Sequence, residues 1–393
     1  MADDLLNSDL PTLAPLDRVM RSFAGERVDR PAVIPKIGVD FGSRLLGLDL
    51  SEVLENPVKA TCVKVRAAMD VKADAVGLSI FPLRRIHRED GDVFEMSKDG
   101  RKIGRIDMVG GLTTIIADRK DYVLEDPVRM ANACHWHAHD PPVDSLEDVE
   151  RIAVPDASVF DELEWGVSLD KIRGRCGKKI ALIADCCSPM TAFLVALRGQ
   201  DRVMFDLNEQ PKLIHALLDK GLAIAYEKAK YWIDHGLKII RINDSAHYPE
   251  LLSNNQWRTY IAPRLKRFCQ KIHAYDHDAK VICHICGDIY PILHDIIETH
   301  LDCIGPIDPH GGHSVHKIRQ EVGKDVLLMG GINTLSFVSS APHAIYDETR
   351  QAIMEGGTDG RFIVSSGCLL PRTARADNIK ACVDAAKSFA KQF

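Results

Sequence analysis

Short apolar runs rich in β-branched residues recur along the second half of the chain, and each is followed by a longer stretch with the apolar spacing of a helix. Continuous apolar strands that alternate with helices are typical of a parallel sheet that is covered on its faces. The pattern predicts strands at residues 178–185, 237–244, 279–285, 301–308, 324–331 and 361–366.

Two further strands are predicted near the start of the chain, at residues 30–38 and 73–80, with a helix over 57–70 between them. Eight strand–helix units favour a (β/α)8 TIM barrel, formed as a single domain by residues 1–393. The alternative is an open doubly wound sheet. It is disfavoured as a dinucleotide-binding fold because no Gly-x-Gly-x-x-Gly motif follows any predicted strand.

A long insertion, residues 86–165, separates the second predicted strand from the third. Its first half is rich in strand-like runs around Asp99-Gly100 and Gly110-Gly111, which predicts a β-meander. Its second half is rich in loop-forming residues. We therefore expect a barrel with an inserted β-rich segment.

Composition and charge exclude several classes of protein. The net charge is −6 without any block of like charge, so no basic surface for nucleic acid is predicted. No apolar run approaches the ~18 residues of a membrane span. The first twenty residues are acidic and lack the apolar core of a secretory signal, and the eleven cysteines are an odd number scattered through apolar segments. These features predict a cytoplasmic protein with reduced thiols.

Three residues with metal-binding side chains follow predicted strands. His284 and Cys286 lie at the end of the fifth strand, and Cys368 lies just after the eighth. Catalytic groups of a TIM barrel gather at these carboxyl ends. One imidazole and two thiolates suit Zn²⁺, and three protein ligands leave one position open for a substrate. The alternative is that both cysteines are incidental loop thiols and His284 a hydrogen-bonded wall residue, and spacing alone does not decide between the two.

Other strand ends supply further candidates. Asp244 is a candidate catalytic acid or base or a hydrogen-bond partner. Candidate substrate-binding residues are Asp185, Asp308, His310 and Tyr248. The adjacent thiols Cys186 and Cys187 could supply a metal ligand, but neighbouring side chains on a strand point in opposite directions, which favours a structural role.

The stretch "CHWHAHD" (134–140) contains three histidines at alternate positions, His135, His137 and His139. On a strand they would share one face, so a second metal site is one interpretation. A surface loop or a pocket wall is favoured because two prolines follow at once and end the strand.

The segments "CHICGDIYPILHDIIETHLDCIGPID" and "RFIVSSGCLLPRTARADNIKA" resemble the C-terminal half of the uroporphyrinogen decarboxylase-like superfamily. More narrowly, they resemble its zinc- and cobalamin-linked methyltransferase branch. "LDRVMRSFAGERVDRPAVIP" is similar to the start of that family and "RINDSAHYPELLSNNQWRTYIAPRLKRF" to its middle. The resemblance implies a barrel of the uroporphyrinogen decarboxylase type, with Zn²⁺ bound by His284, Cys286 and Cys368.

The resemblance also implies a reaction. A methyl group would move from a methoxylated compound, aromatic donors included, to the Co(I) of a separate corrinoid protein. The cobalamin would come on that partner because the chain has no corrinoid-binding Asp-x-His-x-x-Gly pattern. The length of residues 86–165 and the segment "GPIDPHGG" (305–312) favour this O-demethylase type.

Two alternatives stay open. One is a methylcobalamin:thiol methyltransferase of the coenzyme M kind, or a pterin methyltransferase. The other is a cofactor-free decarboxylase. It is disfavoured because "KIGVDFGSRLLG" (36–47) stands where that enzyme carries a basic segment, and Arg44 is the only arginine there. A homo-oligomer is compatible with the sequence, which does not fix the oligomeric state.

Overall fold

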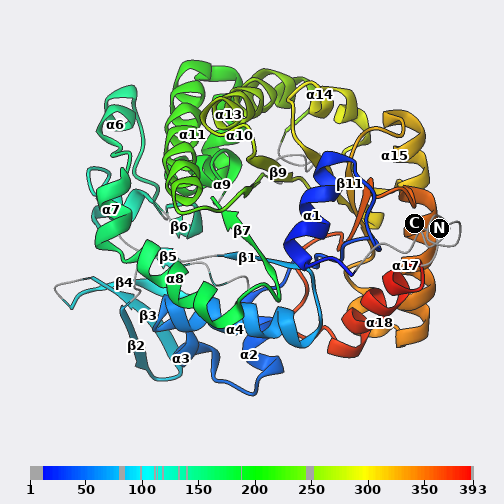
Figure 1. The fold of residues 1–393 in the computed structure, drawn as a ribbon. Helices are drawn as coiled ribbons and strands as arrows, with labels where there is room; N and C mark the ends of the chain where they lie inside the picture. Colours follow the sequence, from blue (N-terminus) through cyan, green and yellow to red (C-terminus); the bar gives the residue numbers. More distant parts are fainter. Residues whose placement is uncertain are drawn as a thin grey trace, which may run out of the picture.

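The computed structural model describes residues 12–390, apart from residues 79–84, 98–99, 110–111, 113, 117–118, 132, 139, 187 and 245–251. Seven parallel strands form one curled sheet in the order β1-β7-β8-β9-β10-β11-β12 (Figure 1). They are β1 (Ala75–Leu78), β7 (Ala181–Asp185), β8 (Ile239–Asn243), β9 (Lys280–His284), β10 (Cys303–Ile307), β11 (Leu328–Ile332) and β12 (Phe362–Ser366). Seven of the eight predicted strands are therefore present.

The remaining predicted strand, residues 30–38, lies beside the sheet without forming a full ladder. It makes two isolated parallel bridges, Val33 with Val364 of β12 and Lys36 with Leu369. On its other side, the chain just ahead of β1 donates a backbone hydrogen bond of 2.8 Å to the Val33 carbonyl. Pro35 has no N–H to donate, which explains why the pairing is interrupted. The structure thus shows a seven-stranded curled sheet with bridges, and not the full eighth strand that the sequence predicts.

Helices cover the outer face of the sheet (Figure 1). Those ahead of β1 are α1 (Pro15–Ala24), α2 (Val39–Leu45), α3 (Leu50–Leu54) and α4 (Pro57–Asp70). Those between and after the later strands are α9 (Thr191–Arg198), α10 (Gln200–Glu209), α11 (Pro211–Asp234), α12 (Asn254–Gln256), the π-helix η4 (Trp257–Ile261), α13 (Ala262–Tyr275), η5 (Tyr290–Ile292), α14 (Leu293–Ile297), η6 (Pro309–Gly311), α15 (Val315–Val322), α16 (Ser336–Ser339), α17 (Pro342–Gly356) and α18 (Ala376–Lys387).

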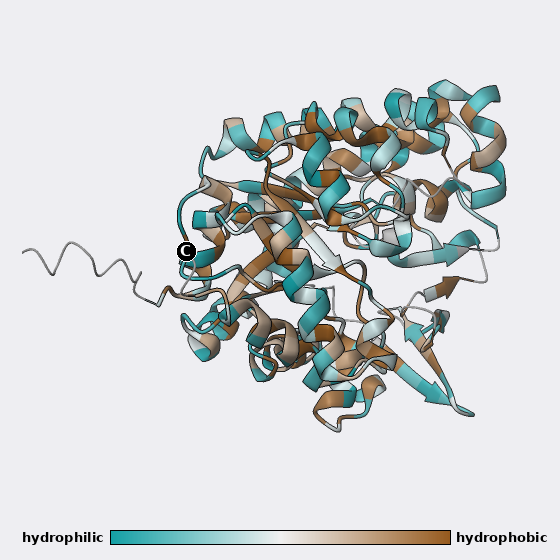
Figure 2. Cartoon of the chain, turned by 90° about the vertical axis from the view of Figure 1, so that its right-hand side faces the viewer, coloured by the Kyte–Doolittle hydropathy of each residue, from teal (hydrophilic) through white to brown (hydrophobic). Residues whose placement is uncertain are grey.

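The interior of the curled sheet is packed with apolar side chains. One strand face contributes buried residues from all seven strands, and these pack with Val19 and Phe23 of α1. The strand residues of this cluster are Ala75, Ala181, Ile183, Ile239, Ile282, Cys303, Met329 and Ile363. Figure 2 shows hydrophobic residues concentrated on the interior strands and hydrophilic residues on the outer sides of the helices. Because the interior is apolar, we expect polar functional side chains at the edge of the sheet, where the strands end.

A second sheet lies between β1 and β7 in the chain, in the order β2-β3-β4-β5-β6. Its strands are β2 (Arg85–Glu89), β3 (Asp92–Met96), β4 (Lys102–Ile106), β5 (Thr114–Ile116) and β6 (Trp136–Ala138). The first four pair antiparallel in succession, and β6 joins β5 in parallel. Asp90 and Gly91 turn the first hairpin with φ of 50° and 87°, the two positive values of a type I′ turn.

Helices also form in this part of the chain. Its helices are η2 (Arg119–Asp121), α5 (Pro127–Met130), η3 (Ala133–His135), α6 (Leu146–Arg151), α7 (Ala157–Glu162) and α8 (Trp165–Cys176). In the part of the chain that the structure describes, no helix is both long enough and apolar enough to cross a membrane.

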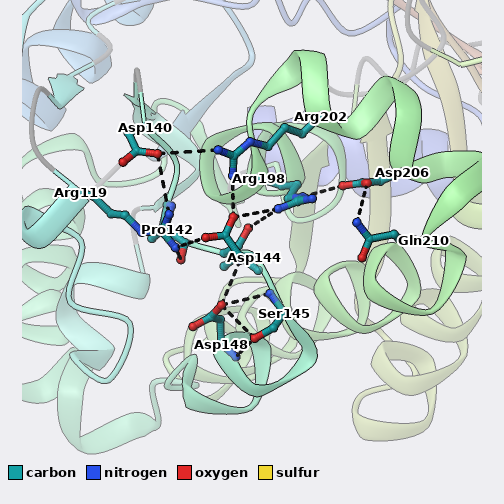
Figure 3. A network of polar contacts seen from close by, with 11 residues as sticks. Arg119, Asp140, Pro142, Asp144, Ser145, Asp148, Arg198, Arg202, Asp206 and Gln210 are labelled. Carbon is teal, nitrogen blue, oxygen red and sulfur yellow. Dashed lines mark hydrogen bonds and ion pairs between the residues drawn. The ribbon is translucent and has the colours of Figure 1, made fainter.

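Ion pairs fasten the loop at residues 140–144 to α9 and α10 (Figure 3). Arg198 donates to Asp206 at 2.5 Å, to the Val143 carbonyl at 2.8 Å and to Asp144 at 3.1 Å. The side chains of Arg198 and Asp206 are 8% and 5% exposed, so this pair is shielded from water. Arg202 reaches the same Asp144 from an exposed position. The buried pair is the part of the network that matters for stability, because exposed pairs contribute little.

We predict that Asp206→Ala lowers the free energy of unfolding by about 3 kcal/mol, because it leaves the Arg198 guanidinium buried without its main partner. The matched control Arg202→Ala removes an exposed ion pair and should cost at most about 1 kcal/mol. Urea unfolding of the two variants and the wild type measures both values. Equal losses of unfolding free energy in the two variants would contradict the larger contribution of the buried Arg198–Asp206 pair.

Candidate metal centre

The carboxyl edge of the parallel sheet brings together the three residues that the sequence singles out. His284 is the last residue of β9, and Cys286 follows in a turn at Gly287, whose φ is 89°. Cys368 lies two residues beyond β12. The metal-binding atoms of the three side chains all lie within 4.8 Å of one another.

The distances within this cluster match a tetrahedral site. The Cys368 and Cys286 sulfurs are 3.8 Å apart, and the Cys368 sulfur is 3.9 Å from His284 Nε2. Two sulfurs that are each ~2.3 Å from one Zn²⁺ at a tetrahedral angle lie about 3.8 Å apart, and a sulfur and an imidazole nitrogen lie about 3.6 Å apart. The three side chains therefore fit the ion without a change of fold.

Burial prepares the cluster for a cation. His284 is 3% and Cys286 2% exposed. Burial, together with the positive charge of Lys36, lowers the pKa of His284 to about 4, so the ring is neutral near pH 7 and keeps a lone pair for a metal. The hydrogen bond with Cys286 and burial raise the pKa of Cys368, so a thiolate there needs a bound cation.

Two hydroxyl groups hold the loop that carries Cys368. Thr334 Oγ1 accepts a hydrogen bond of 2.9 Å from the Cys368 N–H, and Ser366 Oγ donates one of 2.6 Å to the Cys368 carbonyl. Gly367 lets Asp308 approach this loop, since a Cβ there would lie 2.6 Å from Asp308 Oδ1. The main chain of the loop is thus fixed on both sides of the thiol.

The other predicted residues after β10 have local roles in the structure. Asp308 caps the 3₁₀ helix η6, accepting a hydrogen bond of 3.0 Å from the His310 N–H. The His310 side chain is exposed. Asp308 therefore lies beside the candidate metal centre, while its substrate-binding role and that of His310 remain predictions.

Asp185 and Asp244 are both engaged by neighbouring side chains. Asp185 forms a two-pronged ion pair with Arg241, at 2.6 and 2.9 Å. Asp244 is 1% exposed and accepts hydrogen bonds from the Thr191 hydroxyl and, at 3.3 Å, from the Thr191 N–H at the start of α9. This placement makes Asp244 a support for α9, and its catalytic role remains a prediction.

Several other predicted positions are not brought into the cluster. Tyr248, His139 and Cys187 lie outside the residues that the structure describes. His135 ends the short helix η3, and His137 lies on β6 of the second sheet with an exposed side chain. Cys186 is 1% exposed and belongs to the hydrophobic core. Neither histidine belongs to a metal-binding group among the residues described.

The structure also places three residues at this edge that the sequence reasoning did not select. They are Lys36, Arg241 and Thr334. Lys36 lies near the end of the predicted strand at residues 30–38, so its position close to the carboxyl edge was a signal that could have found it. Thr334 carries no such signal, because its contact with Cys368 spans 34 residues of sequence.

Comparison with known proteins agrees with this fold. The family model for uroporphyrinogen decarboxylase (URO-D) matches residues 128–389. A solved structure of a methyltransferase from Methanosarcina mazei superposes with a TM-score of 0.70 at 19% identity, covering 96% of this chain and 99% of that one. The chain therefore belongs to the uroporphyrinogen decarboxylase family, and its fold is that of the solved relative.

Individual relatives carry two kinds of name. A methylated-thiol–coenzyme M methyltransferase of Methanosarcina mazei is 24% identical over 245 residues, covering 62% of this chain and 60% of that protein. The methylcobamide:CoM methyltransferase MtaA of Methanosarcina barkeri is 23% identical, covering 54% and 60%. A uroporphyrinogen decarboxylase of Thermosynechococcus vestitus is 23% identical, covering 64% and 72%. The chain thus matches less than two thirds of the length of both methyltransferases.

We predict that Cys286→Ala and Cys368→Ala each abolish stoichiometric zinc binding, because two protein ligands cannot close a tetrahedral site. Cys283→Ala is the matched control, since Cys283 is a buried core residue on the same strand outside the cluster. Elemental analysis of the purified proteins measures the metal. Zinc that is retained in both ligand variants, or lost equally in the control, would overturn the site.

Thr334→Val should weaken zinc affinity by about 10-fold, since it removes the acceptor that fixes the Cys368 main chain. Thr334→Ser keeps the hydroxyl and should restore the affinity. Competition with a chromophoric chelator measures both. If Thr334→Ser binds zinc as weakly as Thr334→Val does, the hydroxyl is not what holds the loop.

Proposed function

We propose that this protein is a zinc-dependent methyltransferase that transfers a methyl group between a corrinoid carried by a partner protein and a small thiol. The observation that carries the proposal is the cluster of His284, Cys286 and Cys368 at the carboxyl edge of the sheet. Relatives named as methylcobamide:CoM and methylated-thiol–coenzyme M methyltransferases support the same chemistry.

In this proposal the three clustered side chains hold zinc and leave its fourth position for the substrate. When bound, the ion lowers the pKa of a thiol ligand and so supplies a thiolate near neutral pH. The neutral ring of His284 and the hydroxyl-bound loop of Cys368 keep the ligand atoms in place. The substrate thiol gives its proton to solvent. Its sulfur bonds to the methyl carbon as the cobalt–carbon bond breaks, and that electron pair stays on cobalt.

The corrinoid is assigned to a partner because the sequence contains no Asp-x-His-x-x-Gly pattern for binding it. The partner would dock where the zinc site opens, at the carboxyl edge of the sheet. No nucleic acid or membrane has a part in the proposal.

The methoxylated donor of the O-demethylase type has less support than the thiol. Its arguments from sequence were the length of residues 86–165 and the segment "GPIDPHGG" (305–312). The solved methyltransferase of Methanosarcina mazei covers 96% of this chain, so most of that segment has a counterpart there. The length of residues 86–165 therefore gives no reason to prefer a methoxy substrate. Methoxylated compounds are tested in a separate assay below.

Decarboxylation of a porphyrinogen is disfavoured by the first loop. Arg44 is its only arginine, and its guanidinium donates to the main-chain carbonyls of Arg372 and Ala374. A substrate with many carboxylates needs free arginines, because a paired fork of N–H groups binds a carboxylate best. Arg44 therefore already joins α2 to the segment at residues 372–374.

The test mixes the zinc-loaded protein with methylcobalamin and a panel of thiols, and follows the corrinoid absorbance together with methylated product. We expect thiol-dependent demethylation that is lost in Cys368→Ala and kept in Cys283→Ala. A second arm supplies cob(I)alamin with methoxylated compounds, and a third measures uroporphyrinogen decarboxylation. Methyl transfer from methoxylated compounds without any transfer to thiols would show that the substrate is a methoxylated compound and not a thiol. Absence of methyl transfer in both arms would overturn the methyltransferase.

A further inference from the structure

Residues 333–336, which follow β11, form a tight turn that carries Thr334. The Ser336 N–H donates a hydrogen bond of 3.1 Å to the Asn333 carbonyl, and Asn333 Oδ1 accepts one of 2.9 Å from the second residue after it. Thr334 is 7% exposed, and its hydroxyl accepts the hydrogen bond from the Cys368 N–H. The position of the Cys368 main chain therefore depends on this turn.

Glu348 of α17 reaches the same turn from the outer layer of helices. Its helix packs against β11 and β12. Glu348 Oε1 accepts a hydrogen bond of 2.7 Å from the Asn333 N–H, and the Ser336 hydroxyl donates a second one to the carboxylate. Asn333 and Ser336 lie on either side of Thr334 in the chain. Glu348 thus holds the turn on both sides of the residue that fixes Cys368.

The carboxylate of Glu348 is held by hydrogen bonds without a cation. Among the residues that the structure describes, it forms no ion pair with a lysine, an arginine or a histidine. The side chain is half-buried, and burial raises the pKa of Glu348, which its two hydrogen bonds offset only in part. A carboxylate that is removed from water without a cation costs folding free energy. A side chain that only filled space beside the sheet would not need this group, which directs attention to the two hydrogen bonds it makes.

We propose that Glu348 is a positioning residue of the candidate metal centre, which keeps Thr334, and through it the Cys368 thiol, where the other two candidate ligands can share a zinc ion with it. Neither hydrogen-bond partner of Glu348 is a candidate ligand, so it acts through the turn and not on the metal. Groups behind the ligands of a metal site commonly set ligand orientation and metal affinity in this way. This role rests on the zinc site of the proposed function, but not on the identity of its methyl acceptor.

The test measures zinc affinity by competition with a chromophoric chelator, in the full chain and without thiol or corrinoid. Glu348→Leu removes both hydrogen bonds and should weaken zinc affinity about 10-fold. Glu348→Gln keeps an oxygen that accepts from the Asn333 N–H, so it should restore most of the affinity. If Glu348→Leu does not fold, Ser336→Ala takes its place with the same expected direction, and unchanged affinity there would overturn the role.

Glu355→Leu is the matched control. Glu355 lies on the same helix and also accepts a hydrogen bond from a main-chain N–H, that of His316 at 3.1 Å. His316 lies in the first turn of α15 and not in residues 333–336. The control therefore removes a comparable contact of α17 without touching the turn, and its zinc affinity should equal that of the wild type.

A double variant shows whether Glu348 acts through Thr334. If it does, Glu348→Leu should add little to the loss already caused by Thr334→Val, because the connection to Cys368 is broken in both. Zinc affinity that is unchanged in Glu348→Leu, reduced equally in Glu355→Leu, not restored in Glu348→Gln, or reduced additively in the double variant would overturn the role.

The same measurement separates this role from the proposed reaction. A wild-type protein that binds no zinc would overturn the metal centre and the role of Glu348 with it. Zinc binding that depends on Glu348 as expected, in a protein that transfers no methyl group, would support the role and reject the reaction.

Discussion

The parallel pairing of the strands is the constraint on which the candidate site depends. Because all seven strands of the main sheet run in one direction, their carboxyl ends meet at one edge. The register between β8 and β9 sets Asn243 beside His284, and that between β11 and β12 sets Ile332 beside Ser366. A slip by one residue would turn His284 to the other face of the sheet and remove it from the cluster.

Hydrophobic pattern alone predicted the seven strands of this sheet, since each is a continuous apolar run that ends in polar residues. It failed at residues 30–38, where Pro35 breaks the ladder although the run looks like a strand. The grouping of Cys286 with Cys368 came from their places after two predicted strands, and the family resemblance then favoured a metal site over incidental thiols. Thr334 could not be assigned a role from sequence, because only the folded sheet brings it near Cys368. Lys36 lies near a predicted strand end, but its contact with Asn243 also depends on the fold.

The cluster is held by the fold itself. Cys286 and His284 belong to a buried strand end, while the loop of Cys368 is tied to the main chain and to Thr334. In small zinc domains the metal supplies the folding free energy, because little else orders the ligands. Here a large apolar core already orders the three candidate ligands, so a metal ion would not be needed to bring them together. Such preorganisation suits a metal whose fourth position must stay open for chemistry.

The arrangement of charge suggests where substrate choice resides. Arg241 donates hydrogen bonds to both carboxylate oxygens of Asp185. Lys36 lies beside the metal-binding side chains, and its ammonium group donates to the neutral amide of Asn243. The second sheet, which differs most from a minimal barrel, falls within a fold that the solved methyltransferase shares almost completely. A shared scaffold cannot by itself distinguish one methyl acceptor from another. The distinction must come from individual side chains at the strand ends, which lie around the candidate metal centre.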